Sequence, residues 1–383
     1  MKILLTTDTF RPSINGVVIS VENLYKQLVK MGHEVRILTL SFSGYSYKEG
    51  DIYYIRSFNA RIYPGARGTF SYRNRFIKEI IRWSPDIVHS HTEFCTLIHA
   101  KHIRNTLKLP HIHTYHTMYE DYLYYIFKGK LISKRRAMNI IKRLIGSVDE
   151  IITPTQKAKK SLISYGVSKP ISIIPTGIDL SKFKIDNKQL ERAKEIKKSL
   201  GLKEDDKILM FLGRLGKEKN IDEIIMNVKD LKEDINNIKM LVVGGGPYMD
   251  NLKKLVKDLE IEESIIFTGM VSPEEVPIYY SLANIFVTAS TSETQGLTYI
   301  EALASGLPVV CRYDEAVEGL IQNGINGYMY NTKEEFKNSI KDLINKNDDL
   351  EGLRIKAKES VKRFSIDVFA SEVERLYSRY VRK

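Results

Sequence analysis

The sequence contains few cysteines and no long apolar run. Only two of its 383 residues are cysteine, Cys95 and Cys311, which is too few for a structural zinc site and is typical of a reducing compartment. The first residues turn polar after a short apolar run and so lack the apolar stretch of a signal peptide. No run of about 18 apolar residues occurs, so we expect no membrane-spanning segment and a cytoplasmic location.

Acidic residues are scarce in the first half of the chain. Residues 1–178 contain 27 Lys and Arg against 12 Asp and Glu, a net charge of +15, whereas the whole chain carries +12. All eight histidines also lie in this half. A basic half fits contact with something anionic, either nucleic acid or a membrane surface, and it also fits an ordinary basic soluble surface.

Short apolar runs alternate with amphipathic helical patterns along nearly the whole chain. In the first half we expect strands such as Lys2–Thr6, Glu34–Leu40, Asp86–Ser90, His111–Tyr115 and Ile171–Pro175, and helices such as Val17–Met31, Phe94–Leu107 and Thr155–Tyr165. In the second half we expect strands at Ile208–Leu212, Met240–Val243, Ile265–Thr268, Ile285–Ala289 and Pro308–Cys311, and helices such as Ile221–Leu231, Met249–Leu259 and Leu297–Ala304. Strict alternation predicts α/β architecture with two parallel sheets, each covered by helices on both faces.

A chain of this length with 43% apolar residues is too long for one core, so we expect two domains. We place the boundary at residue 178, which gives an N-terminal domain 1–178 and a C-terminal domain 179–365. The helical pattern in 366–383 could cross back and complete the first domain. Ligands bind outside the carboxyl ends of strands in open parallel sheets. Two facing Rossmann-like domains would therefore form a deep cleft, and residues just after strands are the candidates for a site.

Two loops after expected strands contain glycine. Asn15 and Gly16 lead directly into a helix, whose N-terminal amides could approach a phosphate, although a plain helix entry has the same pattern. Gly244, Gly245 and Gly246 follow the strand Met240–Val243. They fit either close backbone approach to a nucleotide or a tight turn.

Basic residues follow the strand Ile208–Leu212 in the segment GRLGKEKN. Arg214 offers a planar fork of donors and Lys219 a point charge, and both groups suit diphosphate oxygens. Exposed basic loops without a ligand are equally common.

The most specific pattern is SETQGLTYIEALASGLP, residues 292–308. Glu293 follows a strand, Gly296, Leu297 and Thr298 open a helix, and Glu301 lies about one turn inside it. Amides at a helix N-terminus favour a phosphate, and carboxylates accept hydrogen bonds from the vicinal diols of sugars. An isolated Glu near a helix start is usually only a partner of the helix dipole, but the whole string favours a sugar-nucleotide site.

This string closely resembles the Glu-x7-Glu motif of the large retaining glycosyltransferase family with the GT-B fold. The resemblance covers nearly the whole chain, because TTDTFRPSINGV, GRLGKEKN and the GGGP turn match as well. HSHTEF (89–94) and HTYHTMYEDYLYY (113–125) resemble the bacterial 1,2-diacylglycerol 3-glucosyltransferases, which make membrane glycolipids from UDP-glucose.

The resemblance implies a role for each matching residue. Glu293 would contact the donor sugar, Glu301 the ribose, Arg214 and Lys219 the diphosphate, and His116 would lie near the reacting sugar, with Gly16, Asn15, Gly244, Gly245, Gly296, Leu297 and Thr298 around the donor and Glu93 and Tyr119 near the acceptor. His116 also follows an expected strand, beside Thr117, Glu120 and Asp121, although it could be a structural histidine clustered with His111 and His113. The sequence contains no Asp-x-Asp, which fits a family in which basic side chains and helix dipoles stabilise the departing phosphate. We therefore expect no metal and no cofactor.

Basic and apolar residues are interleaved in two segments of the first half, 61–83 and 128–143. Cationic and apolar faces at helical spacing are typical of an interfacial helix, although amphipathic core helices show the same pattern. Because the implied acceptor is a lipid, we expect peripheral binding to an anionic membrane surface at the inner face of the cell membrane.

Taken with these patterns, the resemblance implies a retaining, metal-independent transfer of glucose from UDP-glucose to diacylglycerol. One alternative is transfer of another sugar, such as mannose or galactose, to a different lipid or a carbohydrate. A sugar-nucleotide epimerase on the same fold would not need the basic, aromatic face. A nucleic-acid-binding protein is disfavoured, because no recognition-helix or single-strand-binding motif is present, so we expect no nucleic-acid partner.

Overall fold

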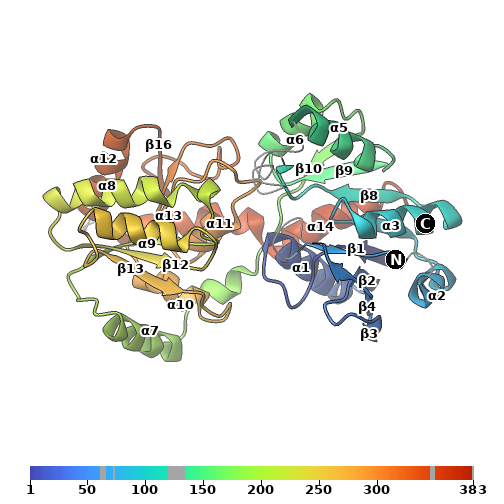
Figure 1. Ribbon diagram of the computed structural model, residues 1–383, viewed down its shortest axis with the longest axis horizontal. Coiled ribbons are helices and arrows are strands. Elements are labelled where there is room, and N and C mark those ends of the chain that lie inside the picture. Colours follow the sequence, from blue (N-terminus) through green and yellow to red (C-terminus); the bar gives the residue numbers. More distant parts are fainter. Residues whose placement is uncertain (61–65, 72–73, 120–133, 346–349, 382–383) are drawn as a thin grey trace. The chain divides into compact units, whose positions relative to one another are not determined.

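The chain forms two α/β domains in the computed structural model, which describes residues 1–60, 66–71, 74–119, 134–345 and 350–381 (Figure 1). The first domain consists of Met1–Ile178 and Phe364–Lys383, and the second of Asp179–Arg363. The chain therefore leaves the first domain after Ile178 and returns to it at Phe364, two residues before the start that we expect for the C-terminal helix.

The first domain is built on an eight-stranded sheet in the order β10-β9-β8-β7-β1-β2-β4-β3. Its elements are β1 (Lys2–Thr6), α1 (Gly16–Lys30), β2 (Glu34–Leu40), β3 (Tyr47–Glu49), β4 (Ile52–Ile55), β5 (Phe58–Asn59), β6 (Arg67–Gly68), α2 (Arg75–Trp83), β7 (Ile87–Ser90), α3 (Cys95–Leu107), β8 (His111–Thr114), α5 (Lys134–Ile145), β9 (Glu150–Thr153), α6 (Gln156–Ser164), β10 (Ile171–Ile173) and α14 (Ile366–Tyr377). The short strands β5 and β6 form a separate antiparallel pair.

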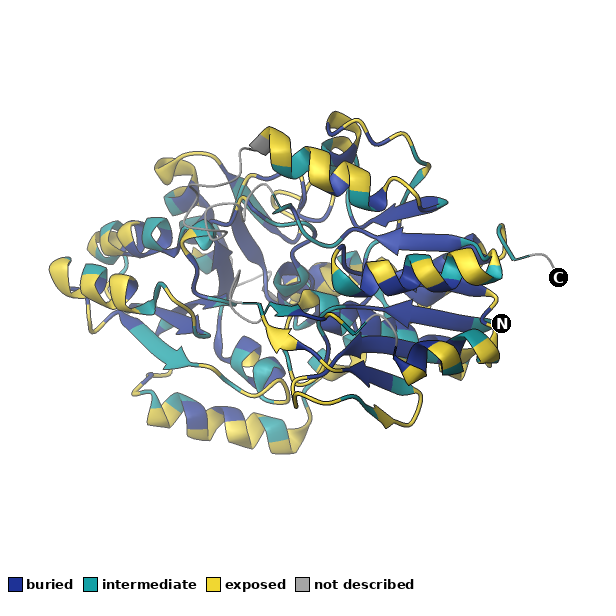
Figure 2. Ribbon diagram, turned by 45° about the vertical axis from the view of Figure 1, so that its right-hand side comes forward, coloured by how far each residue is buried: buried dark blue, intermediate teal, exposed yellow. Residues whose placement is uncertain are grey.

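Both faces of this sheet are covered by helices, as the buried strands and outward-exposed helices of Figure 2 show. In β1, Ile3 and Leu5 pack in one core with residues of α1 and α14, whereas Leu4 packs in another with α2 and α3. Successive strand side chains point to opposite faces, so an uninterrupted apolar run is what a doubly covered strand requires.

One edge of the sheet departs from the parallel arrangement that we expect. The strand β3 pairs antiparallel with β4, and only Gly50 and Asp51 connect the two. Gly50 has a φ of +57°, the left-handed conformation that a two-residue hairpin loop requires. The first sheet is therefore mixed, because this short hairpin falls outside the strand–helix alternation.

The two chain crossings between the domains are tied together within the first domain. Ile178 forms a bridge with Ser365, and its N–H donates to the Phe364 carbonyl oxygen at 2.9 Å. A Cβ at Gly177 would lie 2.6 Å from both the Ser365 carbonyl oxygen and Cβ of Phe369. Only glycine allows the chain segment that leaves the first domain to lie this close to the start of α14.

The second domain is built on a six-stranded parallel sheet in the order β13-β12-β11-β14-β15-β16. Its elements are η2 (Leu180–Phe183), α7 (Asn187–Ser199), β11 (Lys207–Leu212), η3 (Lys217–Lys219), α8 (Ile221–Asp234), β12 (Ile238–Val243), α9 (Met249–Asp258), β13 (Ile265–Gly269), α10 (Val276–Leu282), β14 (Ile285–Thr288), α11 (Leu297–Ala304), β15 (Val309–Arg312), β16 (Gly327–Tyr330), α12 (Lys333–Asn345), α13 (Leu350–Ser360) and η5 (Lys362–Phe364), whose last residue begins the return to the first domain. Because all six strands are parallel, the loops after β11, β12 and β14 meet at one edge.

Candidate active site

The candidate residues of the first domain lie where parallel strands end. Asp8 follows β1, Glu93 follows β7 and His116 follows β8, and these three strands are neighbours in the sheet. Since they run in the same direction, their following loops share the carboxyl edge.

The two residues expected near the acceptor contact one another. Glu93 is 1% exposed and accepts a hydrogen bond from the Tyr119 hydroxyl, and its other oxygen lies 3.2 Å from Nε2 of His113. Burial first, and the Glu93 charge second, raise the pKa of Tyr119, so this phenol stays protonated as a donor. The contacts fix the Glu93 carboxylate at the sheet edge.

His111 and His113 belong to a buried polar network in the sheet. The Ser90 hydroxyl lies 2.8 Å from both His111 Nε2 and His113 Nδ1. Burial lowers the pKa of His111, which keeps its imidazole neutral. These two histidines therefore have a structural role in the sheet.

His116 is in a different position, at the sheet edge and partly exposed. Burial, with a contribution from His113, lowers its pKa to about 3, so it is neutral at any physiological pH. Its Nε2 lies 3.0 Å from Nδ1 of His91, whose own Nε2 is buried without a hydrogen-bond partner among the described residues. A proton on Nδ1 of His91 gives the better arrangement, because the alternative would bury an N–H without an acceptor. His91 therefore donates to His116.

Sequence reasoning did not single out Asp8. Its carboxylate accepts from the backbone N–H of Phe94 at 3.2 Å and of Thr96 at 2.8 Å. Burial raises its pKa, against the lowering effect of these hydrogen bonds. Asp8 holds the start of α3 beside Glu93. Its position directly after the first strand is the signal that could have identified it.

Asn15 caps α1, the helix expected to approach a donor phosphate. Its Oδ1 accepts from the Val18 N–H at 3.0 Å, and its Nδ2 donates to Thr9 Oγ1 at 3.1 Å. The helix begins at Gly16 and has no acidic residue in its first turn. An anion at this terminus would meet the positive end of the helix dipole.

In the second domain, the loop after β11 contains Arg214 and Lys219. Each of these two cations forms an ion pair with a carboxylate. Arg214 pairs with Glu218, whose side chain is 8% exposed. Lys219 Nζ donates to Oε1 of Glu293 at 2.6 Å, so the structure brings the predicted diphosphate and sugar residues of this domain together. Glu218 was not predicted, although it lies four residues after Arg214 in a loop read as basic.

The three glycines after β12 have a packing explanation. A Cβ at Gly244 would lie 2.0 Å from the Gly213 carbonyl oxygen, and one at Gly246 would lie 2.4 Å from the Leu215 carbonyl oxygen. At Gly245 a Cβ would meet the Met270 side chain at 2.9 Å. The glycines let the loops after β11 and β12 touch backbone to backbone, which favours the tight-turn interpretation of the two alternatives.

Gly296, Leu297 and Thr298 form the start of α11, as expected. Gly296 precedes the helix with a φ of +76°, where a Cβ would lie 2.7 Å from the Tyr299 ring. Glu301 lies one turn inside the helix, and the Tyr280 hydroxyl is 3.1 Å from its Oε2. Burial raises the pKa of Glu301 to about 7, while the Tyr280 hydrogen bond and Lys182 act in the opposite direction.

The two basic segments expected to dock on a membrane largely use their apolar residues in the core. In α5, Ile141 and Ile145 pack with Tyr115 and Ile151, and in α2, Phe76, Ile77 and Ile80 are buried. The exposed faces keep basic residues, namely Arg75, Lys78, Arg82, Arg135, Arg136, Lys142 and Arg143. Residues 61–65, 72–73 and 128–133 of these segments, and Glu120 and Asp121 beside His116, lie outside the described residues.

The amphipathic pattern of α2 and α5 therefore largely reflects core packing, and their surface contribution is mainly charge, with Ile140 of α5 47% exposed. Among the described residues, no helix has both the length and the apolar character to cross a membrane.

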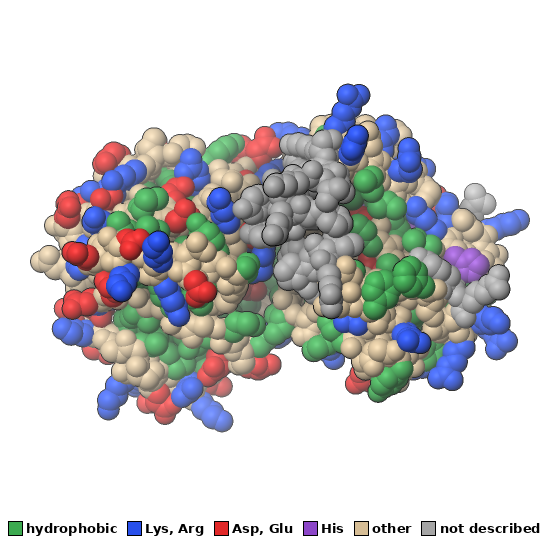
Figure 3. Space-filling model, in the orientation of Figure 1, with side chains coloured by type: hydrophobic (Ala, Val, Ile, Leu, Met, Phe, Trp, Pro, Cys, Tyr) green, Lys and Arg blue, Asp and Glu red, His purple; other side chains and the backbone are tan. Residues whose placement is uncertain are grey.

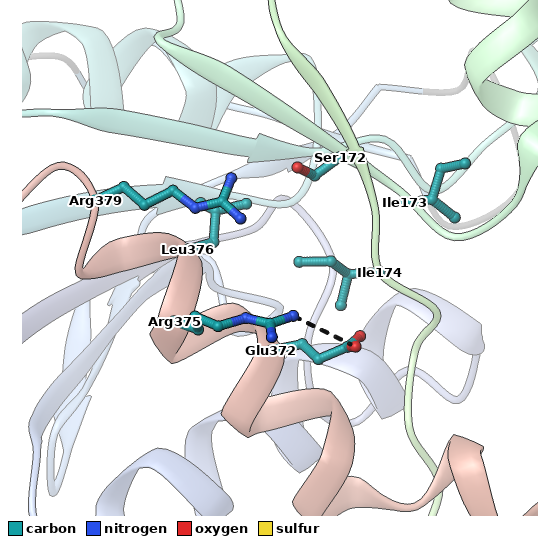
Figure 4. A pocket seen from close by; sticks show the side chains of 7 residues that line it. All are labelled: Ser172, Ile173, Ile174, Glu372, Arg375, Leu376 and Arg379. Carbon is teal, nitrogen blue, oxygen red and sulfur yellow. Dashed lines mark ion pairs between the residues drawn. The ribbon is translucent and has the colours of Figure 1, made fainter.

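A small pocket of the first domain lies away from all predicted site residues. It has a volume of about 170 Å³ and lies between β10 and α14, with Arg375, Arg379, Glu372 and Ser172 in its wall (Figure 4). Arg375 is 3.8 Å from Glu372 and Arg379 is 4.0 Å from Glu150. Its cations are thus already paired within the protein.

Comparisons with known proteins identify related sequences over nearly the whole chain. Residues 14–182 match the family model "Glycosyltransferase Family 4", and residues 192–360 match "Glycosyl transferases group 1". An alpha-monoglucosyldiacylglycerol synthase of Streptococcus pneumoniae is 35% identical over 98% of this chain and 85% of its own length. One of Acholeplasma laidlawii is 32% identical over 98% of this chain and 96% of its own length.

A solved structure supports the fold. The crystal structure of Anabaena Alr3699/HepE in complex with UDP superposes with a TM-score of 0.78 at 15% identity, covering 99% of this chain and 100% of that one. The two synthases share more than 30% identity with this protein over 98% of its chain, and both domains are Rossmann-like. The chain therefore belongs to the group 1 glycosyltransferases of the GT-B fold, and it is a glycosyltransferase.

Proposed function

We propose that this protein transfers glucose from UDP-glucose to diacylglycerol in a membrane surface, with retention of the anomeric configuration. The observation that carries the proposal is the similarity, over nearly the full chain, to two alpha-monoglucosyldiacylglycerol synthases. UDP-glucose carries an α-linked glucose, so an α-glucosyl product corresponds to retention.

The cationic loop after β11 suits the diphosphate of the donor. As the bond between C1 of glucose and the β-phosphate breaks, negative charge develops on the departing oxygen. Preorganised cations near that oxygen stabilise this charge more than they stabilise the ground state. Arg214 and Lys219 already have fixed positions, because Glu218 and Glu293 hold them.

The two glutamates of the motif suit the sugar and the ribose. Glu293 lies beside Lys219, where a sugar attached to the bound diphosphate would follow. Glu301 lies beside Tyr280 in α11, and as a carboxylate it would accept both hydroxyls of a ribose diol. We assign Glu293 to the donor sugar and Glu301 to the ribose.

The carboxyl edge of the first domain suits the acceptor. Glu93 is fixed by Tyr119 and would accept a hydrogen bond from the diacylglycerol hydroxyl. His116 is neutral, so it would contact the reacting sugar as a hydrogen-bonding group without carrying charge. Asp8 would hold the edge in place through α3.

A direct test uses labelled UDP-glucose, UDP-galactose and GDP-mannose with diacylglycerol vesicles, followed by lipid chromatography. We expect labelled lipid from UDP-glucose alone. Labelled lipid from GDP-mannose or UDP-galactose would show that the donor is not UDP-glucose. Label that appears only in soluble sugars would show that the acceptor is not diacylglycerol.

A further inference from the structure

Three phenylalanines and one arginine of the first domain form an exposed cluster, here called the aromatic cluster: Phe42, Phe58, Arg67 and Phe70. Phe70 is 81% exposed, Phe58 43% and Phe42 36%. The Phe58 and Phe70 rings stack with centroids 5.0 Å apart, and the Arg67 guanidinium lies 4.6 Å from the centre of the Phe42 ring. The two pairs are neighbours along the β5–β6 ladder, because Phe58 pairs with Gly68, the residue after Arg67.

The cluster is held in place by the antiparallel pair β5–β6. Phe58 pairs with Gly68 in this ladder, and a Cβ at Gly68 would lie 2.9 Å from the Phe58 ring. Arg67 donates to Oγ of Ser57 at 2.5 Å and to its carbonyl oxygen at 3.2 Å. The exposed rings are therefore presented by fixed backbone.

The cluster lies at the carboxyl edge of the first sheet, the edge that carries the acceptor candidates. Phe42 follows β2 and Phe58 follows β4, which run parallel to β1. Thr69 of the same segment contacts Cys95 at the start of α3 through its backbone. Phe94, the residue before Cys95, is itself half-exposed, and its ring meets that of Tyr119 edge-on at 5.7 Å.

Exposed stacked aromatics beside cations fit one partner chemistry in particular. Aromatic rings are favourable at the boundary between lipid headgroups and acyl chains, and nearby Lys and Arg are attracted to anionic headgroups. The first domain supplies the charge: Arg56 and Arg75 flank the cluster in sequence and are exposed, and the domain is strongly basic. On the face shown in Figure 3, acidic side chains are sparse over the first domain, where hydrophobic side chains also gather.

We propose that the aromatic cluster inserts into the outer part of an anionic phospholipid bilayer and so brings the carboxyl edge of the first domain to its lipid acceptor. This inference rests on the proposed function and adds its membrane contact, which lies in the loop after β2 and in the segment that contains β5 and β6. The helices α2 and α5 supply attraction through charge, while insertion comes from Phe42, Phe58 and Phe70. Phe58 and Phe70 carry most of the insertion.

The test compares wild type with the double variant Phe58→Ser/Phe70→Ser in sedimentation with vesicles of phosphatidylcholine and phosphatidylglycerol. Ile163→Ser is the matched control, because Ile163 is 54% exposed in the same domain but lies on α6, outside the cluster. Loss of two partly inserted rings is expected to weaken vesicle binding by roughly tenfold to a hundredfold. The control should bind as wild type does, and UDP binding should be unchanged in both variants.

A second measurement locates the rings. In the Trp83→Phe background, Phe70→Trp provides the single tryptophan of the chain. With vesicles containing phospholipids brominated near the headgroup end of the acyl chains, we expect its emission to shift to shorter wavelength and to be quenched. Emission that stays unchanged on bound vesicles would overturn insertion.

The outcomes separate this inference from the proposed function. Weaker vesicle binding by the double variant, even if wild type transfers no glucose to diacylglycerol, supports the membrane contact and refutes only the acceptor. Unchanged vesicle binding, with glucose transfer intact, refutes the aromatic cluster and leaves the function standing. A wild type that dimerises while the double variant is monomeric, with equal vesicle binding, would show that the cluster binds a second copy.

Discussion

At the scale of single residues, Arg214 is the most direct test of the donor site. Removing one preorganised donor to a developing oxyanion lowers turnover by roughly 10²–10³, and we expect Arg214→Ala to fall in this range while the protein stays folded. Steady-state kinetics and circular dichroism check both points. Arg192→Ala is the control, because Arg192 also forms ion pairs in the second domain but is exposed on α7. Wild-type turnover in a folded Arg214→Ala variant would remove Arg214 from the site.

Substitutions of the two motif glutamates should have different effects on UDP affinity, measured by calorimetry. Glu293→Gln is expected to keep UDP affinity and lose transfer, because its proposed partner is the sugar, which UDP lacks. Glu301→Ala is expected to weaken UDP binding, because its proposed partner is the ribose. The opposite pattern would exchange the two assignments.

The titration of Glu301 predicts a pH dependence. Its pKa rises from the ordinary 4.5 to about 7 on folding, because burial disfavours the charged form. Between these two values the folded state holds a proton that the unfolded state has released, so stability of the second domain falls as pH rises through this window. UDP affinity should rise over the upper part of it, since the ionised carboxylate is the better acceptor for a diol.

Glu301→Gln provides the comparison for both effects. At pH 8 the variant should be more stable than wild type in urea unfolding, and its UDP affinity should be lower and flat between pH 6 and 8. A wild-type UDP affinity that is constant across this range would contradict the carboxylate role.

At the scale of secondary-structure elements, α14 is fixed to the first domain by a buried hydrogen bond. The Tyr377 hydroxyl lies 2.6 Å from Nδ1 of His89, and both groups are buried. Burial lowers the pKa of His89, so its imidazole is neutral, and its two nitrogens are held by the Tyr377 and Thr114 hydroxyls. Tyr377→Phe leaves a buried imidazole nitrogen without its partner, at a cost of about 1–3 kcal/mol.

Urea unfolding of the first domain measures this cost. Tyr45→Phe is a suitable control, because Tyr45 lies in the same domain and is 63% exposed, so removal of its hydroxyl should change stability little. Equal stability of Tyr377→Phe and wild type would mean that this hydrogen bond does not contribute to holding α14.

The periodicity of the sequence predicted the parallel core of both domains, because apolar runs in doubly covered strands are distinctive. It did not predict the β3–β4 hairpin, since a three-residue strand leaves too short a pattern. It also could not distinguish a helix whose apolar face packs in the core, such as α5, from one that lies on a membrane. At the site, the loops after strands were found, but the partners Glu218, Tyr280 and Asp8 were not, because their roles depend on contacts between loops.

At the scale of the whole molecule, catalysis is expected to need no metal ion. Arg214, Lys219 and the N-terminus of α11 together provide positive charge for the diphosphate. Turnover should therefore persist when the protein is dialysed against a chelating resin and assayed in the presence of EDTA. Activity that is lost in EDTA and restored by magnesium or manganese would show that a cation shares this role.

The central claim is that the chain forms an α-glucosidic bond to diacylglycerol from UDP-glucose. The most direct measurement is the proton NMR spectrum of the lipid product purified from vesicles after incubation with UDP-glucose, read at the anomeric proton. The account predicts one glucose in α-linkage to the glycerol hydroxyl. A β-linked product, or glucose found only on a soluble acceptor or in free solution, would contradict it.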